Sequence, residues 1–173
     1  MKINFFKLSI YFITSLILVL FFFGLSKDNT YNTSSLINKK IGKFQLHSLD
    51  ELKKISEEDL KNNRFTLINF WASWCAPCRK EHKYLLYLNK INKMKVLGIN
   101  YKDKKKNAEN FLKELGNPFY FVGQDLKGKI SVSFGIYGIP ESILIDTNLI
   151  IIKKFIGPLD ENDVNEILRL IKK

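Results

Sequence analysis

The feature that most constrains the fold is an alternation of short apolar runs with longer amphipathic segments, which begins at Ile41. Short, continuous apolar runs are typical of buried β-strands, and they occur at Phe65–Phe70, Lys95–Asn100, Ser142–Asp146 and Ile150–Phe155. Apolar residues at helical spacing predict helices at Pro77–Ile91, Lys104–Leu115 and Asp160–Ile171. This order predicts a single α/β domain with parallel middle strands and an antiparallel hairpin around Thr147-Asn148.

Three local signals mark expected helix ends. The sequence Ser48-Leu49-Asp50-Glu51 has the pattern of a capping box and predicts a helix start. Asp160 is an expected N-cap of the last helix. Gly116-Asn117-Pro118 predicts the end of the helix that precedes it, because glycine tolerates the left-handed backbone of a helix terminus.

The N-terminal segment predicts a membrane anchor. Leu8–Leu25 contains no charged side chain and follows Lys2 and Lys7, and at about 1.5 Å per residue it is long enough to cross a hydrocarbon core about 30 Å thick. The positive flank favours a cytoplasmic N-terminus, so the rest of the chain would be exported. The alternative is a cleaved signal peptide ending at Gly24-Leu25-Ser26. We expect residues 1–25 to be the anchor, 26–40 a polar tether and 41–173 the folded domain.

The composition supports a domain with a substantial core and no nucleic-acid partner. The chain has 173 residues, of which 46% are hydrophobic, so it can offset chain entropy without several disulfides. A net charge of +11 raises the question of nucleic acid or an anionic membrane as a partner. The lysines are scattered through predicted helices and turns, and no nucleic-acid-binding motif is present. We interpret the charge as a solvated basic surface.

The only two cysteines, Cys75 and Cys78, stand at a predicted junction between a strand and a helix. Pro77 lies where that helix would begin, and Ala76-Pro77 set the spacing of the pair. Unpaired backbone N–H groups and the positive end of the helix stabilise a thiolate there, so we expect a lowered pKa at Cys75 and assign it as the nucleophile. Cys78, one turn later and facing inward, is placed to attack a mixed disulfide formed at Cys75.

Two other interpretations of the pair remain open from the residues alone. The cysteines could supply half of a zinc site with His47 and His82 as the other ligands. Structural zinc sites usually have a second closely spaced ligand pair, whereas these histidines are solitary, so we expect no metal, with His82 on the surface of its helix and His47 in a loop. The second alternative is a pair of packed, inert cysteines.

Several motifs resemble one family of redox proteins. The segment Trp71–Leu85, "WASWCAPCRKEHKYL", is similar to the active-site segment of thioredoxin-like proteins. More narrowly, "NYKD" at Asn100–Asp103, "FLKELGNPF" at Phe111–Phe119 and "FGIYGIPESILID" at Phe134–Asp146 resemble the cytochrome c biogenesis thiol:disulfide interchange proteins of the DsbE/CcmG group. The resemblance runs from about Ile41 onward and implies a thioredoxin-like fold, a central mixed sheet flanked by helices.

The resemblance also implies a substrate groove beside the cysteines. It implies a cis peptide bond at Pro140, which would leave the backbone of Ile139 exposed to pair with an extended substrate peptide. Tyr137 is expected in the groove wall, with core packing as the alternative. Trp74 is expected to be a partly exposed contact surface, and Trp71 to be part of the core.

A carboxylate near the pair could accept the proton of Cys78 during resolution. General thioredoxins have an aspartate where this chain has Asn69, which cannot take a proton, so the base must lie elsewhere. We expect Glu141 in this role, with Glu81 as the second candidate and water as the third.

Taken with the anchor, the resemblance implies a thiol:disulfide oxidoreductase on the periplasmic side of the bacterial inner membrane. Its substrate would be the disulfide of apocytochrome c or of a cytochrome c maturation partner, reduced before haem attachment. Electrons would come from a transmembrane disulfide reductase, and no cofactor is implied. The alternatives are a general reductase of envelope proteins and a non-catalytic module that docks apocytochrome or haem.

Overall fold

The computed structural model describes residues 5–25 and 36–172, which belong to two separate units. The first unit contains α1 (Phe5–Leu25), and within it residues Phe5–Gly24 have a mean hydropathy of 2.2. Among the described residues this is the one helix long and apolar enough to cross a membrane. Most of the predicted tether, residues 26–35, lies outside the described residues.

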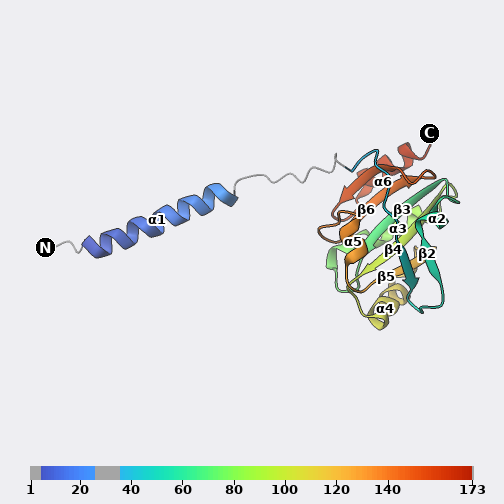
Figure 1. Cartoon of the computed structure of the whole chain (residues 1–173), viewed down its shortest axis with the longest axis horizontal. Coiled ribbons are helices and arrows are strands. Elements are labelled where there is room, and N and C mark those ends of the chain that lie inside the picture. The colour runs from blue at the N-terminus through green and yellow to red at the C-terminus, as the bar shows by residue number, and fades with distance from the viewer. Residues whose placement is uncertain (1–4, 26–35, 173) are drawn as a thin grey trace. The chain divides into compact units, whose positions relative to one another are not determined.

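The second unit is built on a mixed seven-stranded sheet, as far as residues 36–172 are concerned (Figure 1). Its strands stand in the order β2-β1-β5-β4-β3-β6-β7. The bounds are β1 (Gln45–Ser48), β2 (Lys54–Ser56), β3 (Phe65–Trp71), β4 (Met94–Tyr101), β5 (Phe121–Asp125), β6 (Glu141–Asp146) and β7 (Ile151–Ile156). β3, β4 and β5 are parallel, whereas β6 and β7 form the antiparallel hairpin that the sequence predicts.

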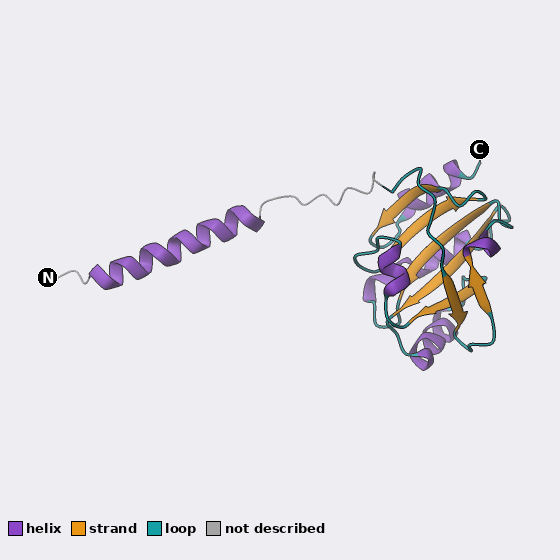
Figure 2. Ribbon diagram, viewed as in Figure 1, coloured by secondary structure: helices purple, strands orange, loops and turns teal. Residues whose placement is uncertain are grey.

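Helices cover both faces of the sheet (Figure 2). They are α2 (Glu57–Leu60), α3 (Ala76–Leu88), α4 (Lys105–Leu115), α5 (Lys129–Ser133) and α6 (Glu161–Leu170). All seven residues of β3 are buried, and successive side chains point to opposite faces. Leu67 and Trp71 join the core under α3, α4 and α6, while Ile68 and Phe70 join the core on the other face. Burial on both faces explains the unbroken apolar run of β3. The expected α/β fold with a central mixed sheet flanked by helices is confirmed.

One predicted helix start is wrong. Ser48–Glu51 is not the beginning of a helix but part of the turn between β1 and β2. The Ser48 hydroxyl oxygen accepts from the N–H of Lys53 at 3.1 Å, and a carboxylate oxygen of Asp50 accepts from the N–H of Leu52 at 3.1 Å. The same short polar side chains that cap helices also close turns by bonding nearby backbone, so the local pattern does not separate the two structures.

Residues 36–40, expected in the tether, pair with the folded domain. The N–H of Asn38 donates to the carbonyl of Ile151 at 2.9 Å, and Lys40 forms a β-bridge with Ile150. The expected signals at the other helix ends are confirmed, since Asp160 caps α6 and Gly116 follows α4 with φ of 87°.

Candidate functional site

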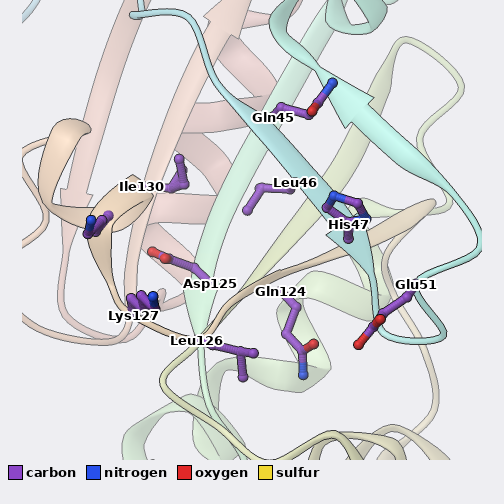
Figure 3. Close-up of a pocket in the computed structure, with 10 residues that line it drawn as sticks. Gln45, Leu46, His47, Glu51, Gln124, Asp125, Leu126, Lys127 and Ile130 are labelled. Carbon is purple, nitrogen blue, oxygen red and sulfur yellow. The ribbon is translucent and has the colours of Figure 1, made fainter.

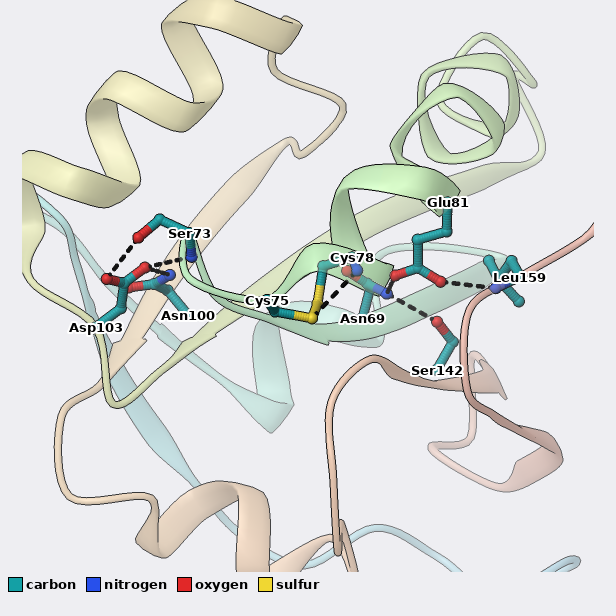
Figure 4. The surroundings of a disulfide bond; sticks show 9 residues. All are labelled: Asn69, Ser73, Cys75, Cys78, Glu81, Asn100, Asp103, Ser142 and Leu159. Carbon is teal, nitrogen blue, oxygen red and sulfur yellow. Dashed lines mark hydrogen bonds between the residues drawn. A yellow bond between two sulfur atoms is a disulfide. The ribbon is translucent and has the colours of Figure 1, made fainter.

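The cysteine pair lies where β3 ends and α3 begins (Figure 4). Cys75 is the N-cap of α3, with Ala76 as the first helical residue and Pro77 in the first turn, where a missing N–H costs the helix nothing. The N–H of Cys78 donates to the Cys75 sulfur at 3.1 Å. The two sulfurs form a disulfide, and the residues are only 4% and 2% exposed, respectively. The predicted placement of the pair at a helix N-terminus is confirmed.

The loop before Cys75 is held by a buried aspartate from the loop that follows β4. Asp103 accepts from the N–H of Ser73 at 2.6 Å, from its hydroxyl at 2.8 Å and from the side-chain amide of Asn100 at 3.0 Å. Trp74, 59% exposed, donates from its indole N–H to the carbonyl of Lys102 at 3.2 Å. Trp74 is therefore exposed, as expected, and its role as a contact surface stays a prediction.

A buried polar cluster lies behind the pair, as the residues drawn in Figure 4 show. Glu81 stands one turn after Cys78 on α3 and is fully buried. One of its oxygens accepts from the Asn69 amide at 2.8 Å, and the other accepts from the N–H of Leu159 at 2.8 Å. The Asn69 amide also donates to the Ser142 hydroxyl at 3.0 Å. Burial raises the pKa of Glu81 from 4.5 to about 7, against the lowering effect of these hydrogen bonds.

Glu141 lies on the opposite face of the sheet. It pairs with Phe70, whose side chain belongs to the core away from α3, while its neighbour Ser142 faces Asn69 and Glu81. Its carboxylate forms a buried ion pair with Lys154 at 2.7 Å. This geometry does not support the expectation that Glu141 takes the proton of Cys78, and it favours Glu81, the second candidate.

The segment before Glu141 runs beside the active-site loop. Because β6 is antiparallel to β3, residues that precede Glu141 lie alongside those that follow Phe70. The Ile139–Pro140 peptide bond is cis, as the resemblance implied. Ile139 is half-buried and packs against the core that contains both cysteines, and Tyr137 is 78% exposed, which rules out simple core packing.

Both histidine predictions are wrong. His82 is buried on α3, where its Nε2 donates to the carbonyl of Gly116 at 2.8 Å, and burial lowers its pKa. His47 belongs to β1 and not to a loop. The periodicity of α3 could have indicated a buried position for His82, since it lies between the buried residues Cys78 and Leu85.

Sequence reasoning also missed several residues that support the site. Asp103 carried a signal, because it belongs to the NYKD motif and lies two residues after the end of a strand. Lys154 carried another, since a lysine within an apolar strand is buried only when it is paired. Ser142 gave no signal, because its hydrogen bond with Asn69 depends on the pairing of two strands that are far apart in the sequence.

A separate pocket of about 450 Å³ lies between β1, the end of β5 and α5 (Figure 3). His47, Gln124 and Lys127 are among the residues that line it, and neither the cysteines nor Glu81 are. We therefore place the candidate site at the cysteine pair and not at this pocket.

Comparisons with known proteins show the family to which the chain belongs. A family model described as Redoxin matches residues 36–171. The thiol:disulfide interchange protein DsbE of Escherichia coli (strain K12) is 42% identical over 134 residues, which cover 77% of this chain and 72% of that protein. The thiol:disulfide interchange protein HelX of Rhodobacter capsulatus is 35% identical over 133 residues, covering 77% and 75% of the two chains.

Solved structures show the same fold. The crystal structure of a thiol:disulfide interchange protein of the thioredoxin family from Chlorobium tepidum superposes with a TM-score of 0.66 at 25% identity, covering 79% of this chain and 97% of that one. The fold, the family model and the similarity over most of both sequences lead to one conclusion. The chain belongs to the DsbE-type thiol:disulfide interchange proteins and is a thiol:disulfide oxidoreductase with a Cys-x-x-Cys pair at Cys75 and Cys78.

Proposed function

We propose that this oxidoreductase is a membrane-anchored reductant that acts outside the cytoplasm on the disulfide of apocytochrome c, or of a maturation partner, before haem attachment. The observation that carries the proposal is the cysteine pair at the N-terminus of α3 with the buried carboxyl of Glu81 behind it. The apolar helix α1, preceded by Lys2 in the sequence, supports an anchor with a cytoplasmic N-terminus.

In the first step, the Cys75 thiolate attacks one sulfur of the substrate disulfide. A bond forms between the Cys75 sulfur and that sulfur as the substrate S–S bond breaks, and the other substrate sulfur leaves and takes up a proton. The N-terminus of α3 stabilises the attacking thiolate, because the sulfur lies at the positive end of the helix and accepts from the N–H of Cys78.

In the second step, Cys78 resolves the mixed disulfide. Its thiol loses a proton to Glu81 and attacks the Cys75 sulfur, so that the Cys75–Cys78 disulfide forms and the remaining substrate sulfur leaves as a thiolate. The cysteine pair is oxidised by two electrons and the substrate is reduced by two. A pKa of about 7 suits Glu81 to this exchange, because a proton acceptor works best when its pKa lies near the working pH.

The enzyme must then be reset by a dithiol. By the same exchange in reverse, a dithiol of a transmembrane disulfide reductase attacks the Cys75–Cys78 disulfide, returns it to two thiols and is itself oxidised to a disulfide. Substrate would bind as an extended segment along the backbone of Ile139 and against the exposed indole of Trp74.

A mixed-disulfide trap tests the proposal. Full-length Cys78→Ala protein, expressed in bacteria that assemble c-type cytochromes, should accumulate a disulfide between Cys75 and apocytochrome c or a maturation protein, which mass spectrometry of non-reduced membranes would identify. The double variant Cys75→Ser/Cys78→Ala is the control and should capture nothing. Capture of unrelated envelope proteins alone would indicate a general reductase. Cytochrome assembly that survives Cys75→Ser would instead indicate a docking module and contradict the proposal.

A further inference from the structure

A buried lysine stands on the sheet face opposite the cysteine pair. The side chain of Lys154, in β7, is 0% exposed, and a lysine is almost never fully buried unless it is paired. Its ammonium contacts a Glu141 carboxylate oxygen at 2.7 Å and donates to the carbonyl of Gly135 at 2.6 Å. It also lies over the ring of Tyr137, 6.0 Å from the ring centroid.

Glu141 extends these contacts to the backbone. Its other carboxylate oxygen accepts from the N–H of Tyr137 at 3.2 Å and from the N–H of Gly138 at 3.1 Å. An ionised carboxylate is the stronger acceptor for two N–H groups, and a buried one needs a cation beside it. Lys154 and Glu141 together therefore hold the segment Gly135–Glu141 at its start, in its middle and at its end.

This segment borders the redox site. The pairing of Glu141 with Phe70 places the residues before Glu141 beside the chain that leads from β3 to Cys75. Ile139 packs against the core that contains both cysteines. A shift of the segment would therefore move the backbone that faces a bound substrate, while Cys75 stays on α3.

We propose that Lys154 is a positioning residue for substrate recognition: through Glu141 it fixes the backbone of Tyr137–Ile139 against which a disulfide-containing peptide binds. This inference rests on the proposed function, because it presumes an extended peptide substrate. Lys154 takes no part in electron or proton transfer. Its loss should weaken peptide binding and leave the chemistry at Cys75 intact.

The test compares Lys154→Met with Lys153→Met in full-length protein in non-ionic detergent. Lys153 is the neighbouring lysine of β7 and forms its ion pair with Glu166 at 2.8 Å, away from the segment. Each variant is first reduced to the Cys75–Cys78 dithiol and freed of reductant, and single turnovers are followed over a range of concentrations of a synthetic peptide carrying a Cys-x-x-Cys-His disulfide or of a small aromatic disulfide, dithiobis(nitrobenzoate). Here kcat is the maximal single-turnover rate and KM the substrate concentration that gives half of it. The small reagent makes no extended backbone pairing, so it reports on the cysteines alone.

For Lys154→Met we expect KM for the peptide to rise about tenfold, the effect of losing one or two backbone hydrogen bonds, with kcat changed less than about twofold. The rate with the small disulfide should stay within about twofold of wild type. Lys153→Met should match wild type with both substrates. An unchanged KM in folded Lys154→Met, or an equal loss with both substrates, would overturn the inference.

Two double variants keep the test decisive if Lys154→Met does not fold. Neither Lys154→Met/Glu141→Gln nor Lys154→Met/Glu141→Ala buries an unpaired charge, but only the glutamine retains an oxygen that can accept from Tyr137 and Gly138. The glutamine variant should have a peptide KM several-fold lower than the alanine variant, and equal KM values would contradict the inference. A wild-type enzyme that reduces the small disulfide but no peptide would instead refute the proposed function.

Discussion

Replacing the buried carboxyl of Glu81 should remove a pH-dependent cost to stability. Because burial raises its pKa from 4.5 to about 7, the folded protein holds this proton more tightly than the unfolded chain does. The free energy of unfolding therefore falls as the pH rises from about 4.5 to about 7, and the full cost is present above that range. With about 1.4 kcal/mol for each pKa unit, ionised Glu81 costs the folded state about 3 kcal/mol at pH 8.

Glu81→Gln keeps the shape of the side chain and cannot ionise. Its oxygen can accept from the N–H of Leu159, and its amide would then face Asn69. Among the described residues the side-chain oxygen of Asn69 has no hydrogen-bond partner, so rotation of that amide would let it accept. Any cost of this rearrangement to stability does not depend on pH. The part of the stability difference between variant and wild type that changes with pH therefore reports the titration of Glu81 alone.

The assay is urea unfolding of full-length, oxidised protein in non-ionic detergent, followed by tryptophan fluorescence from pH 4.5 to pH 8.5. Relative to its value at pH 4.5, the stability difference should rise by about 3 kcal/mol in favour of Glu81→Gln, with most of the rise between about pH 5 and about pH 7 and a plateau above that range. Glu114→Gln, which removes an exposed carboxylate paired with Arg79, is the control and should follow wild type across the same range. A difference for Glu81→Gln that does not change with pH would refute the reasoning.

Three further substitutions test the surroundings of the site. Asp103→Ala should lower stability by about 2 kcal/mol and slow disulfide exchange, because the half-buried donors of Ser73 lose their acceptor; urea unfolding and a peptide-reduction assay measure this. Gly98→Ala should cost about 1–3 kcal/mol in thermal unfolding, since its Cβ would meet the ring of Phe119 at 2.7 Å. Because its pKa is lowered, His82 makes a contribution to stability that is lost as the pH falls below 6.5, opposite in sign to that of Glu81; the stability difference between His82→Gln and wild type should therefore shift in favour of the variant from pH 7 to pH 5, measured by calorimetry.

The position of the redox pair could be predicted from the sequence because every signal for it is local. An apolar run ends at Trp71, two cysteines follow, and Pro77 fits only the first turn of a helix. These features span only a few residues, so they predict the same local structure in any fold that contains them. The types of the long strands and helices could also be predicted, because the spacing of apolar residues along the chain is a local property.

Which of the two carboxyl groups lies on the same face of the sheet as the pair could be predicted only in part from local sequence. Glu81 lies three residues after Cys78 on one helix, and this spacing alone places their side chains on the same face. Glu141 attracted the prediction because it follows Pro140, but strand pairing decides its side of the sheet. A shift of one residue in that register would turn its side chain to the other face, and nothing in the local sequence fixes the register.

The sequence by itself determined the chemistry of the protein: a cysteine pair at a helix N-terminus in an α/β domain preceded by an apolar helix. Only the tertiary structure decided which carboxyl group lies on the same face of the sheet as the pair and how burial changes its pKa. Burial in the folded domain raises the pKa of Glu81, while a hydrogen bond from the N–H of Leu159, far along the chain, acts in the opposite direction. Burial and charge pairing arise between distant segments, so they exist only once the chain has folded.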